Sequence, residues 1–305
     1  MKNIQFYVRD QSAAWPGSWA DDRTPSRYQP RRHHGIEETV VASPYDPMAE
    51  RFERQRALPD GVVRSVRGAV MAALKHLDRP RLLDLGAGGG RFGWPFVAAG
   101  DDYVGVDLSA GMLRVFADRC AGGARAMLVQ ADGGALPFPD ASFDAVLLIA
   151  VFGDLSDWRP LVGEARRVLR SPRGAIIIGR TGAPDHGIDE RMRQCLDTLL
   201  EERMPGLGMR RRHSGTGREE AVQYLAAAAS ATTKLTVANW SVERSPRAFL
   251  DRHAGGARFS RLPRAIVEDA LRALGEWAQT EFGTLEAGFA ETHCFDMRLF
   301  RFARG

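Results

Sequence analysis

Short apolar runs alternate with longer stretches in which apolar residues recur every three or four positions across residues 61–180. The short runs have the length of buried strands, and the longer stretches have the period of amphipathic helices. The expected strands are residues 81–85, 103–107, 125–130, 144–149 and 175–179, and the expected helices are residues 61–77, 91–99, 109–120 and 157–170. The run at 144–149 is continuously apolar, as in a central parallel strand. This alternation predicts an α/β fold with a doubly wound, Rossmann-like sheet.

The pattern changes after residue 180. Residues 188–203 and 218–231 have helical patterns and flank a loop rich in glycine and arginine. A doubly wound sheet needs only a short link here, so we expect residues 181–233 to be an inserted helical cap after strand five, on the substrate side. Strand patterns at 235–242 and 294–303 then bring the expected sheet to seven strands.

The chain therefore divides into four expected parts. They are an irregular arm (1–44), a Rossmann-like core (45–180), the cap insertion (181–233) and a C-terminal part that completes the sheet (234–305). The arm is polar and shows neither helical nor strand periodicity, yet it contains Trp15 and Trp19. Two tryptophans are unusual in a purely disordered tail, so the arm could pack on the core or form a homo-oligomer contact.

A glycine-rich turn lies at the centre of the core. Residues 83–91 read LDLGAGGGR, so an apolar strand runs straight into Gly86, Gly88 and Gly90. Glycines let the backbone take unusual dihedral angles and let a ligand approach closely. A strand, a glycine turn and the start of a helix together form a nucleotide-type binding site.

Acidic residues follow each of the first three strands of the core. Asp107 ends the second strand, where it could accept hydrogen bonds from a ribose diol. Asp84 lies two residues before the first glycine and could receive an ammonium group, and Asp132 follows the third strand and could accept from an adenine amino group. The ribose acid alone suits NAD and S-adenosylmethionine equally well, whereas the other two favour S-adenosylmethionine.

The ordered set LDLGAGGGR, VGVDLS and ADGGALPFPDASFDAV resembles the class I S-adenosylmethionine-dependent methyltransferases. It is most similar to their type 11 domain group, which includes quinone-biosynthesis enzymes. The resemblance implies a seven-stranded sheet that is mostly parallel, with the last strand antiparallel. It also implies S-adenosylmethionine as cofactor and a small-molecule methyl acceptor. The cofactor-binding residues that it implies are Tyr45, Asp84, Gly86, Gly88, Gly90, Asp107, Leu108, Met112, Asp132, Gly133 and Ile149.

No histidine follows the fourth strand, where many type 11 relatives carry one or two. Gly153 and Asp154 stand there instead. A general base is needed only if the acceptor is a hydroxyl, a protonated amine or an acidic carbon. The candidates are Asp154 and His253, which we select, together with His213 and His293.

Composition restricts the possible substrates and activities. The formal net charge is +4, and arginine supplies nearly all of the positive charge. A basic balance could suit RNA or an acidic protein, but neither a nucleic-acid-binding motif nor interleaved aromatic residues accompany the arginines. The alternatives to small-molecule methylation are RNA or protein methylation and S-adenosylmethionine binding without turnover; a nicotinamide dehydrogenase ranks last.

The three cysteines are isolated, and no metal-ligand spacing is present, so we expect no metal site. The sequence contains neither an apolar run long enough to span a membrane nor the apolar core of a signal peptide. We therefore expect a cytoplasmic protein.

Overall fold

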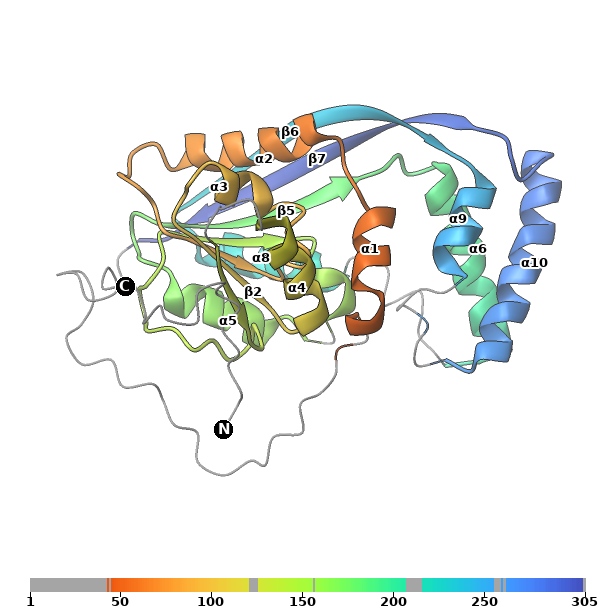
Figure 1. Ribbon diagram of the computed structural model, residues 1–305, viewed down its shortest axis with the longest axis horizontal. Coiled ribbons are helices and arrows are strands. Elements are labelled where there is room, and N and C mark those ends of the chain that lie inside the picture. The colour runs from red at the N-terminus through yellow and green to blue at the C-terminus, as the bar shows by residue number, and fades with distance from the viewer. Residues whose placement is uncertain are drawn as a thin grey trace, which may run out of the picture.

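The computed structural model is shown in Figure 1. It describes residues 43, 45–120, 126–155, 157–206, 216–254, 259 and 262–303, apart from the side chains of residues 154 and 216. The expected N-terminal arm, with Trp15 and Trp19, lies outside the described residues.

Seven strands form one sheet within the described part of the chain. They are β1 (Leu82–Leu85), β2 (Tyr103–Asp107), β3 (Met127–Gln130), β4 (Ala145–Ile149), β5 (Ala175–Gly182), β6 (Ala231–Arg244) and β7 (Phe289–Arg301). Their order is β3-β2-β1-β4-β5-β7-β6. The first five strands are parallel, and β7 is antiparallel to both of its neighbours. The expected mostly parallel α/β sheet with an antiparallel strand is confirmed.

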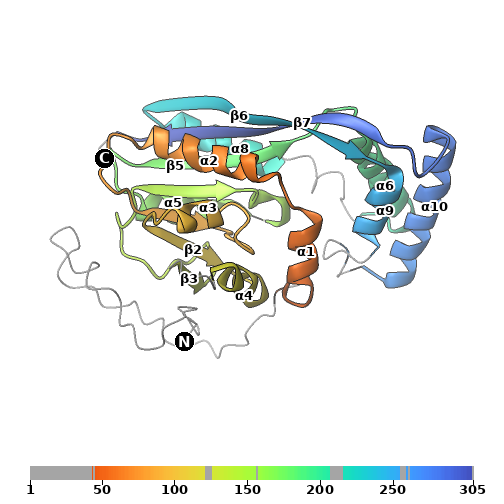
Figure 2. The same cartoon turned by 45° about the horizontal axis from the view of Figure 1, so that its top comes forward.

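Helices cover both faces of this sheet (Figure 2). One face carries α2 (Asp60–Ala73), α3 (Trp94–Ala98) and α4 (Ala110–Arg119), and the other carries α5 (Arg159–Val168) and α8 (Thr216–Ala228). The alternating apolar residues of each strand divide between two separate apolar clusters, one on each face. The helix expected at 91–99 is regular only over α3, because Gly90 and Gly93 form tight turns before it.

Three helices form a separate group at one end of the molecule (Figure 1). They are α6 (Ile188–Arg203), α9 (Pro246–His253) and α10 (Arg264–Phe282), and they share an apolar cluster that includes Leu196, Leu200, Phe249 and Leu274. The cap therefore consists of one helix that precedes β6 in the sequence and two that follow it. The expected cap instead combines residues 188–203 with 218–231. The second of these, α8, packs on the sheet because Ala221, Val222 and Leu225 continue the apolar cluster of α5.

A long two-stranded ribbon carries the cap. The pairing of β5 with β7 stops at Gly182 and Cys294, but β6 and β7 remain paired as far as Arg244 and Phe289. Figure 2 shows the ribbon extending from the sheet to the cap helices. The cap thus lies beyond the carboxyl ends of β4 and β5, the edge at which such sheets bind ligands.

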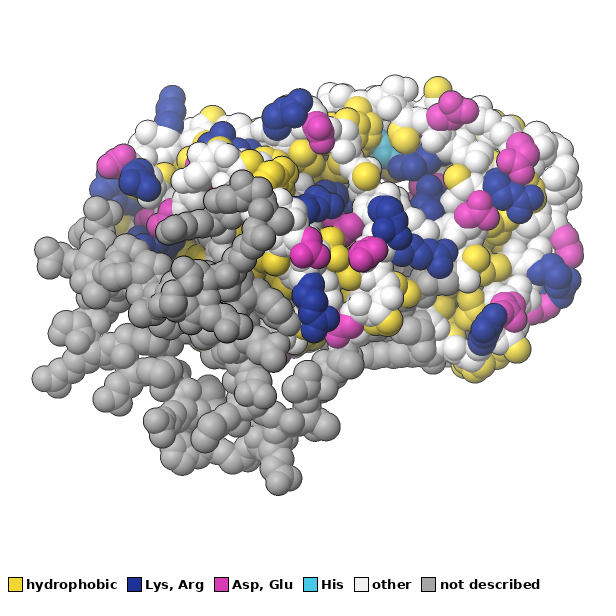
Figure 3. All heavy atoms as spheres, viewed as in Figure 1, with side chains coloured by type: hydrophobic (Ala, Val, Ile, Leu, Met, Phe, Trp, Pro, Cys, Tyr) yellow, Lys and Arg dark blue, Asp and Glu magenta, His cyan; other side chains and the backbone are white. Residues whose placement is uncertain are grey.

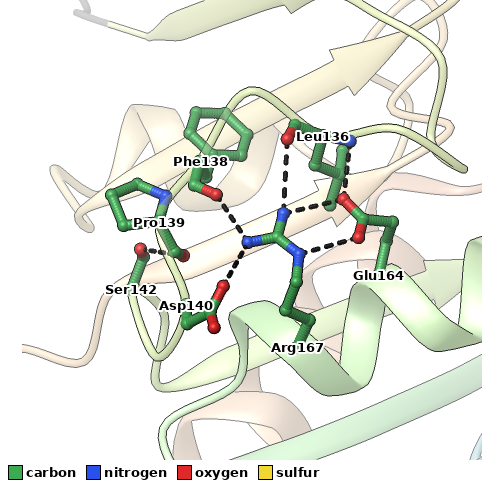
Figure 4. Close-up of polar contacts among 7 residues, drawn as sticks. All are labelled: Leu136, Phe138, Pro139, Asp140, Ser142, Glu164 and Arg167. Carbon is green, nitrogen blue, oxygen red and sulfur yellow. Dashed lines mark hydrogen bonds and ion pairs between the residues drawn. The ribbon is translucent and has the colours of Figure 1, made fainter. Parts of the chain in front are cut away.

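One arginine holds the loop between β3 and β4. Arg167 donates to the carbonyl oxygens of Phe138 (2.8 Å) and Leu136 (3.3 Å) and to the carboxylate of Asp140 (2.7 Å). It also donates twice to Glu164, at 2.7 Å each, and Glu164 accepts from the amide of Leu136 (Figure 4). The acidic partners raise the pKa of Arg167 above its ordinary value. This network fixes a loop that contains no helix.

We expect Arg167→Met to lower the free energy of unfolding by about 2–3 kcal/mol, because it leaves the partly buried carboxylate of Glu164 and two carbonyl groups without their donor. Chemical denaturation measures the change. Arg64→Met is the matched control, because Arg64 is exposed and lies 4.0 Å from Asp60. Equal stabilities of the two variants would contradict the role of the network.

Candidate functional site

The turn after β1 is closely packed at its glycines. Gly86, Gly88 and Gly90 have φ angles of 80°, 55° and 80°, a region that favours glycine. A Cβ atom on Gly90 would lie 2.2 Å from the ring of Phe116, and one on Gly86 would lie 2.7 Å from the side chain of Val151. The glycines predicted from sequence therefore bring β1 directly against α4 and against the end of β4.

Asp84 is buried beneath this turn. Its Oδ2 accepts a 2.6 Å hydrogen bond from the hydroxyl of Tyr103, while Oδ1 is buried and has no hydrogen-bond partner. Burial raises the pKa of Asp84 to about 7, an effect opposed by the bond from Tyr103 and reinforced by the charge of Asp107. An unpartnered, buried carboxylate oxygen is costly, and a cationic ligand would relieve that cost.

Asp107 lies at the end of β2, beside the same turn. Its Oδ2 accepts from the amide of Gly88 (2.9 Å) and its Oδ1 from the amide of Ser109 (2.8 Å). Burial raises its pKa, although these two bonds oppose the shift. Each carboxylate oxygen has two lone pairs, so Asp107 can still accept from a ligand hydroxyl.

Asp132 follows β3, the third strand along this edge. Its Oδ1 accepts from the amide of Gly134 at 2.8 Å, and its side chain is exposed. The backbone of Gly133 lies against α5, where a Cβ atom would come within 2.5 Å of Leu161. The structure thus places three acids at or just beyond the carboxyl ends of three neighbouring strands, in the order predicted from sequence.

The segment before α1 (Ala49–Gln55) is fixed at the start of α4. It forms a single-turn helix, η2 (Asp46–Met48), and Asp46 accepts from the hydroxyl of Ser109 (2.6 Å) and the amide of Gly111 (2.8 Å). The ring of Tyr45 packs edge-on against Phe52 with the centroids 5.0 Å apart. Tyr45 is therefore held close to the loop of Asp107. Sequence reasoning missed Asp46, although the Asp-Pro pair at the start of a helix is a usable signal.

Glu53 is a second residue that sequence reasoning missed. It projects from α1 onto the glycine turn, where a Cβ atom on Gly89 would lie 2.4 Å from its Cγ. Glu53 is buried and pairs with Arg119 at 3.1 Å. Arg91 lies nearby, with its Nη1 bonded to the carbonyl of Arg56 and its Nε buried without a hydrogen-bond partner. Nothing in the sequence pattern distinguishes these residues from an ordinary surface helix.

The predicted apolar contacts lie in different surroundings. Leu108 is exposed, with an exposed fraction of 52%, immediately after Asp107. Met112 is buried, and its Cε lies 3.2 Å from where a Cβ on Gly88 would be. Ile149, at the end of β4, is buried beside Gly179 and Phe295. Their contact with a cofactor stays a prediction.

The candidate bases that the structure describes lie on different elements. Asp154 closes a short helix, η4 (Phe152–Asp154), after β4, and its side chain lies outside what is described, as does the whole of His213. His253 ends α9, where its Nδ1 lies 2.8 Å from the carbonyl oxygen of Phe249 and its ring stacks on that phenylalanine. The described contacts of His253 lie within the cap, and the side chain of Asp154 is not described. The catalytic roles of Asp154 and His253 therefore stay predictions.

His293 has a different environment. It lies on β7, is buried, and its Nε2 is 3.0 Å from Oε2 of Glu291, which is also buried. The Glu-x-His spacing in the sequence is compatible with two side chains on the same face of a strand. Spacing alone could not show that both are buried.

No helix among the described residues is long and apolar enough to cross a membrane. Within the same residues, no group of three or more His, Cys, Asp or Glu side chains is arranged to hold a metal ion.

Comparison with known proteins gives a consistent family. The model of a methyltransferase domain matches residues 83–178, from β1 into β5. The demethylmenaquinone methyltransferase of Clavibacter sepedonicus is 34% identical over 167 residues, which cover 53% of this chain and 68% of that protein. The enzyme of the same name from Thermobifida fusca is 32% identical over 155 residues, covering 50% of this chain and 66% of its own length.

Solved structures are also similar. The YcgJ protein of Bacillus subtilis aligns with a TM-score of 0.48 and 21% identity, covering 78% of this chain and 98% of that chain. A putative methyltransferase from Bacillus halodurans aligns with a TM-score of 0.48 and 17% identity, covering 77% and 100%. The family assignment rests on the sequence matches. By these matches, the chain belongs to the class I S-adenosylmethionine-dependent methyltransferases of the type 11 group.

Proposed function

We propose that this chain transfers the methyl group of S-adenosylmethionine to a small-molecule acceptor that binds between the edge of the sheet and the cap. The observation that carries the proposal is the arrangement of Asp84, Asp107 and Asp132 around the glycine turn, with one buried oxygen of Asp84 lacking a partner. The arrangement combines an acid-rich edge with closely approachable backbone, which suits a cationic nucleoside.

The residues present fit S-adenosylmethionine. Its ammonium group would satisfy the unpartnered oxygen of Asp84, its ribose hydroxyls would donate to Asp107, and its adenine amino group would donate to Asp132. Tyr45 and Leu108 are proposed to contact the adenosine from the outer side, and Met112, Gly133 and Ile149 to contact it from within. Asp46 and Glu53 add negative charge to the same region, since both raise the pKa of Asp107.

S-adenosylmethionine, when bound, supplies a methyl group on a sulfonium centre that is already an excellent leaving group. The protein therefore acts mainly by aligning the acceptor with that carbon and by excluding water. The closely packed glycine turn, which Tyr103, Phe116 and Val151 keep rigid, provides the fixed side of this alignment. We propose that the cap helices α6, α9 and α10 provide the adjustable side.

The relatives suggest which acceptors to examine first. Their name identifies a demethylmenaquinone acceptor, so quinols are the first class to screen for this chain. The methyltransferase-domain match ends at residue 178, before the cap begins, so the part of the chain that we propose to select the acceptor lies outside it. A different acceptor within the same chemistry is therefore compatible with the match.

A nucleic-acid substrate receives less support. On the face shown in Figure 3, Lys and Arg side chains are interspersed with Asp and Glu side chains over both the core and the cap. Several arginines pair with neighbouring acids, as Arg203 does with Asp269 and Arg252 with Asp189. We propose a cytoplasmic enzyme without a nucleic-acid partner, in which the N-terminal arm could contribute a homo-oligomer contact.

Isothermal titration tests the cofactor assignment. We expect micromolar binding of S-adenosylmethionine and of S-adenosylhomocysteine, and no binding of NAD. Asp107→Asn should weaken S-adenosylmethionine binding at least tenfold, because the substitution removes the charged acceptor for the ribose hydroxyls. The exposed Asp118→Asn in α4 is the control and should bind like the unmodified protein.

Because the carboxylate of Asp107 also accepts two backbone bonds, the melting temperature of each variant must be recorded beside its affinity. Unchanged affinity in a folded Asp107→Asn variant would overturn the ribose assignment. Failure of the unmodified chain to bind S-adenosylmethionine would overturn the proposed function itself.

Asp84 predicts a pH dependence. With a pKa of about 7, its carboxyl is mostly protonated below that pH, whereas the ammonium group needs the ionised form. Binding must then release a proton, so the affinity for S-adenosylmethionine should fall about tenfold between pH 8 and pH 6. Calorimetry in two buffers of different ionisation enthalpy measures the proton release directly.

Asp84 makes the folding stability of the ligand-free protein depend on pH in the opposite direction. Between about pH 4 and pH 7 the unfolded chain binds fewer protons at Asp84 than the folded chain, so this residue lowers stability as the pH rises. Asp84→Asn should abolish both dependences, and Asp118→Asn should keep them. An affinity of the unmodified protein that stays constant from pH 8 to pH 6 would contradict the ammonium assignment.

A further inference from the structure

We infer that His293, held in place by Glu291, is the base that takes a proton from the methyl acceptor. The inference rests on the proposed function, and it restricts the acceptor to molecules that lose a proton during methylation: those with a hydroxyl, an N–H or an acidic C–H group. Nothing in the resemblance to known methyltransferases pointed to this pair. It is carried by the position, burial and hydrogen bonding of the two side chains.

The position follows from the register of β7. Glu291, His293, Phe295 and Met297 alternate as buried residues on one face of this strand. Phe295 marks where that face meets the core, because its ring lies 5.2 Å from that of Phe92, two residues beyond the glycine turn. A Cβ on Gly179 would lie 2.8 Å from the same ring.

His293 lies one step farther along β7 on the same face. The pairing of β5 with β7 ends at Gly182 and Cys294, so His293 is just past the carboxyl end of β5. It is therefore at the edge of the sheet where ligands bind, between the glycine-turn side of the core and the cap.

The hydrogen bonds of the pair fix the tautomer of the imidazole. Glu291 accepts from the amide of Ile188 through Oε1 (2.5 Å) and faces Nε2 of His293 through Oε2 (3.0 Å). An ionised carboxylate can only accept, so Nε2 carries the hydrogen and Nδ1 carries the free lone pair. Among the residues that the structure describes, none hydrogen-bonds to Nδ1. A carboxylate that orients a histidine in this way also stabilises the imidazolium formed after proton transfer.

The anchoring of Glu291 makes the pair rigid. Ile188 is the first residue of α6, so its amide belongs to the positive end of that helix dipole, which favours the ionised carboxylate. The backbone of Gly187 approaches closely, since a Cβ there would lie 2.8 Å from Oε1 of Glu291. The same pair therefore connects the sheet to the cap and sets the distance between them.

The charged groups around the pair come from three further elements. Arg244 lies on the same face of β6 as Trp240, and the ring of Trp240 is 5.9 Å from that of His293. Asp189 of α6 pairs with Arg244 at 3.4 Å and also with Arg252 of α9. The two arginines balance the two acids, Asp189 and Glu291, so the imidazolium formed at His293 would supply the positive charge that stabilises an acceptor as it becomes an anion.

The proton and electron balance of the step is simple. The acceptor's X–H bond breaks, the proton goes to Nδ1 of His293, and the electron pair left on X forms the new bond to the methyl carbon. The carbon–sulfur bond of the sulfonium breaks with both electrons going to sulfur, which yields neutral S-adenosylhomocysteine sulfur. His293 becomes an imidazolium beside Glu291 and later gives its proton to water.

Nitrogen NMR of the full chain tests this without any acceptor. The chain has seven histidines, so the protein is labelled with 15N-histidine and the His293 signals are assigned by their loss in His293→Gln. At pH 7 we expect the tautomer with hydrogen on Nε2, and a shift of the Nδ1 signal when the protein is saturated with S-adenosylhomocysteine. The tautomer with hydrogen on Nδ1, or no shift at saturation, would overturn the inference.

Calorimetry on the same samples separates the two possible failures. If S-adenosylhomocysteine does not bind, the proposed function fails; if it binds and the His293 signals do not respond, only the base assignment fails. His76→Gln is the matched control, because His76 is exposed and contacts only the carbonyl of Arg173 among the hydrogen bonds described. Its loss should leave the His293 signals unchanged.

Kinetics with 1,4-naphthoquinol as the acceptor probe gives a second readout. His293→Gln should lower kcat at least a hundredfold, with KM and the affinity for S-adenosylmethionine changed less than twofold. The glutamine amide keeps a donor for Glu291, so the anchor of the cap is retained and the melting temperature should stay close to that of the unmodified protein. A folded His293→Gln variant with unchanged kcat would contradict the inference.

Discussion

The structure depends on one close packing constraint, the absence of side chains in the turn after β1. Phe116 and Tyr103 occupy the space that side chains on Gly90 and Gly93 would need. Because they do, α4 lies directly against the turn, and the hydroxyl of Tyr103 reaches Asp84 beneath it. A single larger residue would push α4 away, expose Asp84 to water, and separate the two strands whose acids define the site. The glycines are therefore structural and functional at once.

The order of the elements and the three acids could be predicted because both depend on local sequence. Buried parallel strands are short and continuously apolar, as β4 is, and the ends of neighbouring parallel strands meet at one edge. Asp84 and Asp107 lie within the last two residues of β1 and β2, and Asp132 follows β3, so the fold alone brings them to one edge of the sheet. The glycine spacing was informative for the same reason: a strained turn needs particular residues at particular positions.

The remaining features depend on contacts between residues far apart in the chain, which periodicity does not encode. Two helices, α6 and α8, follow β5, and only their partners decide that one joins the cap and the other covers the sheet. Asp46 binds Gly111, 65 residues away, and Glu53 packs on Gly89, 36 residues away. The Glu291 and His293 pair was visible as spacing, but its burial became apparent only with the register of β7.

The electrostatics of the site connect these separate features. Burial raises the pKa values of Asp84 and Asp107. The charge of Asp107 raises the pKa of Asp84 further, and the charges of Asp46 and Glu53 raise the pKa of Asp107 further. Burying several carboxylates together is unfavourable unless positive charge or donors compensate. Within the described residues Arg119 compensates Glu53, and backbone amides compensate Asp107, but one oxygen of Asp84 has neither. The ligand-free protein therefore retains the free-energy cost of this buried, unpartnered oxygen at the base of the glycine turn. A ligand that carries both a cation and a diol would remove that cost. The base inferred on β7 lies apart from this acidic cluster, and its protonated form would be positive. The two sides of the site would therefore favour opposite charges: a cationic donor at the glycine turn and an acceptor that becomes anionic beneath the cap.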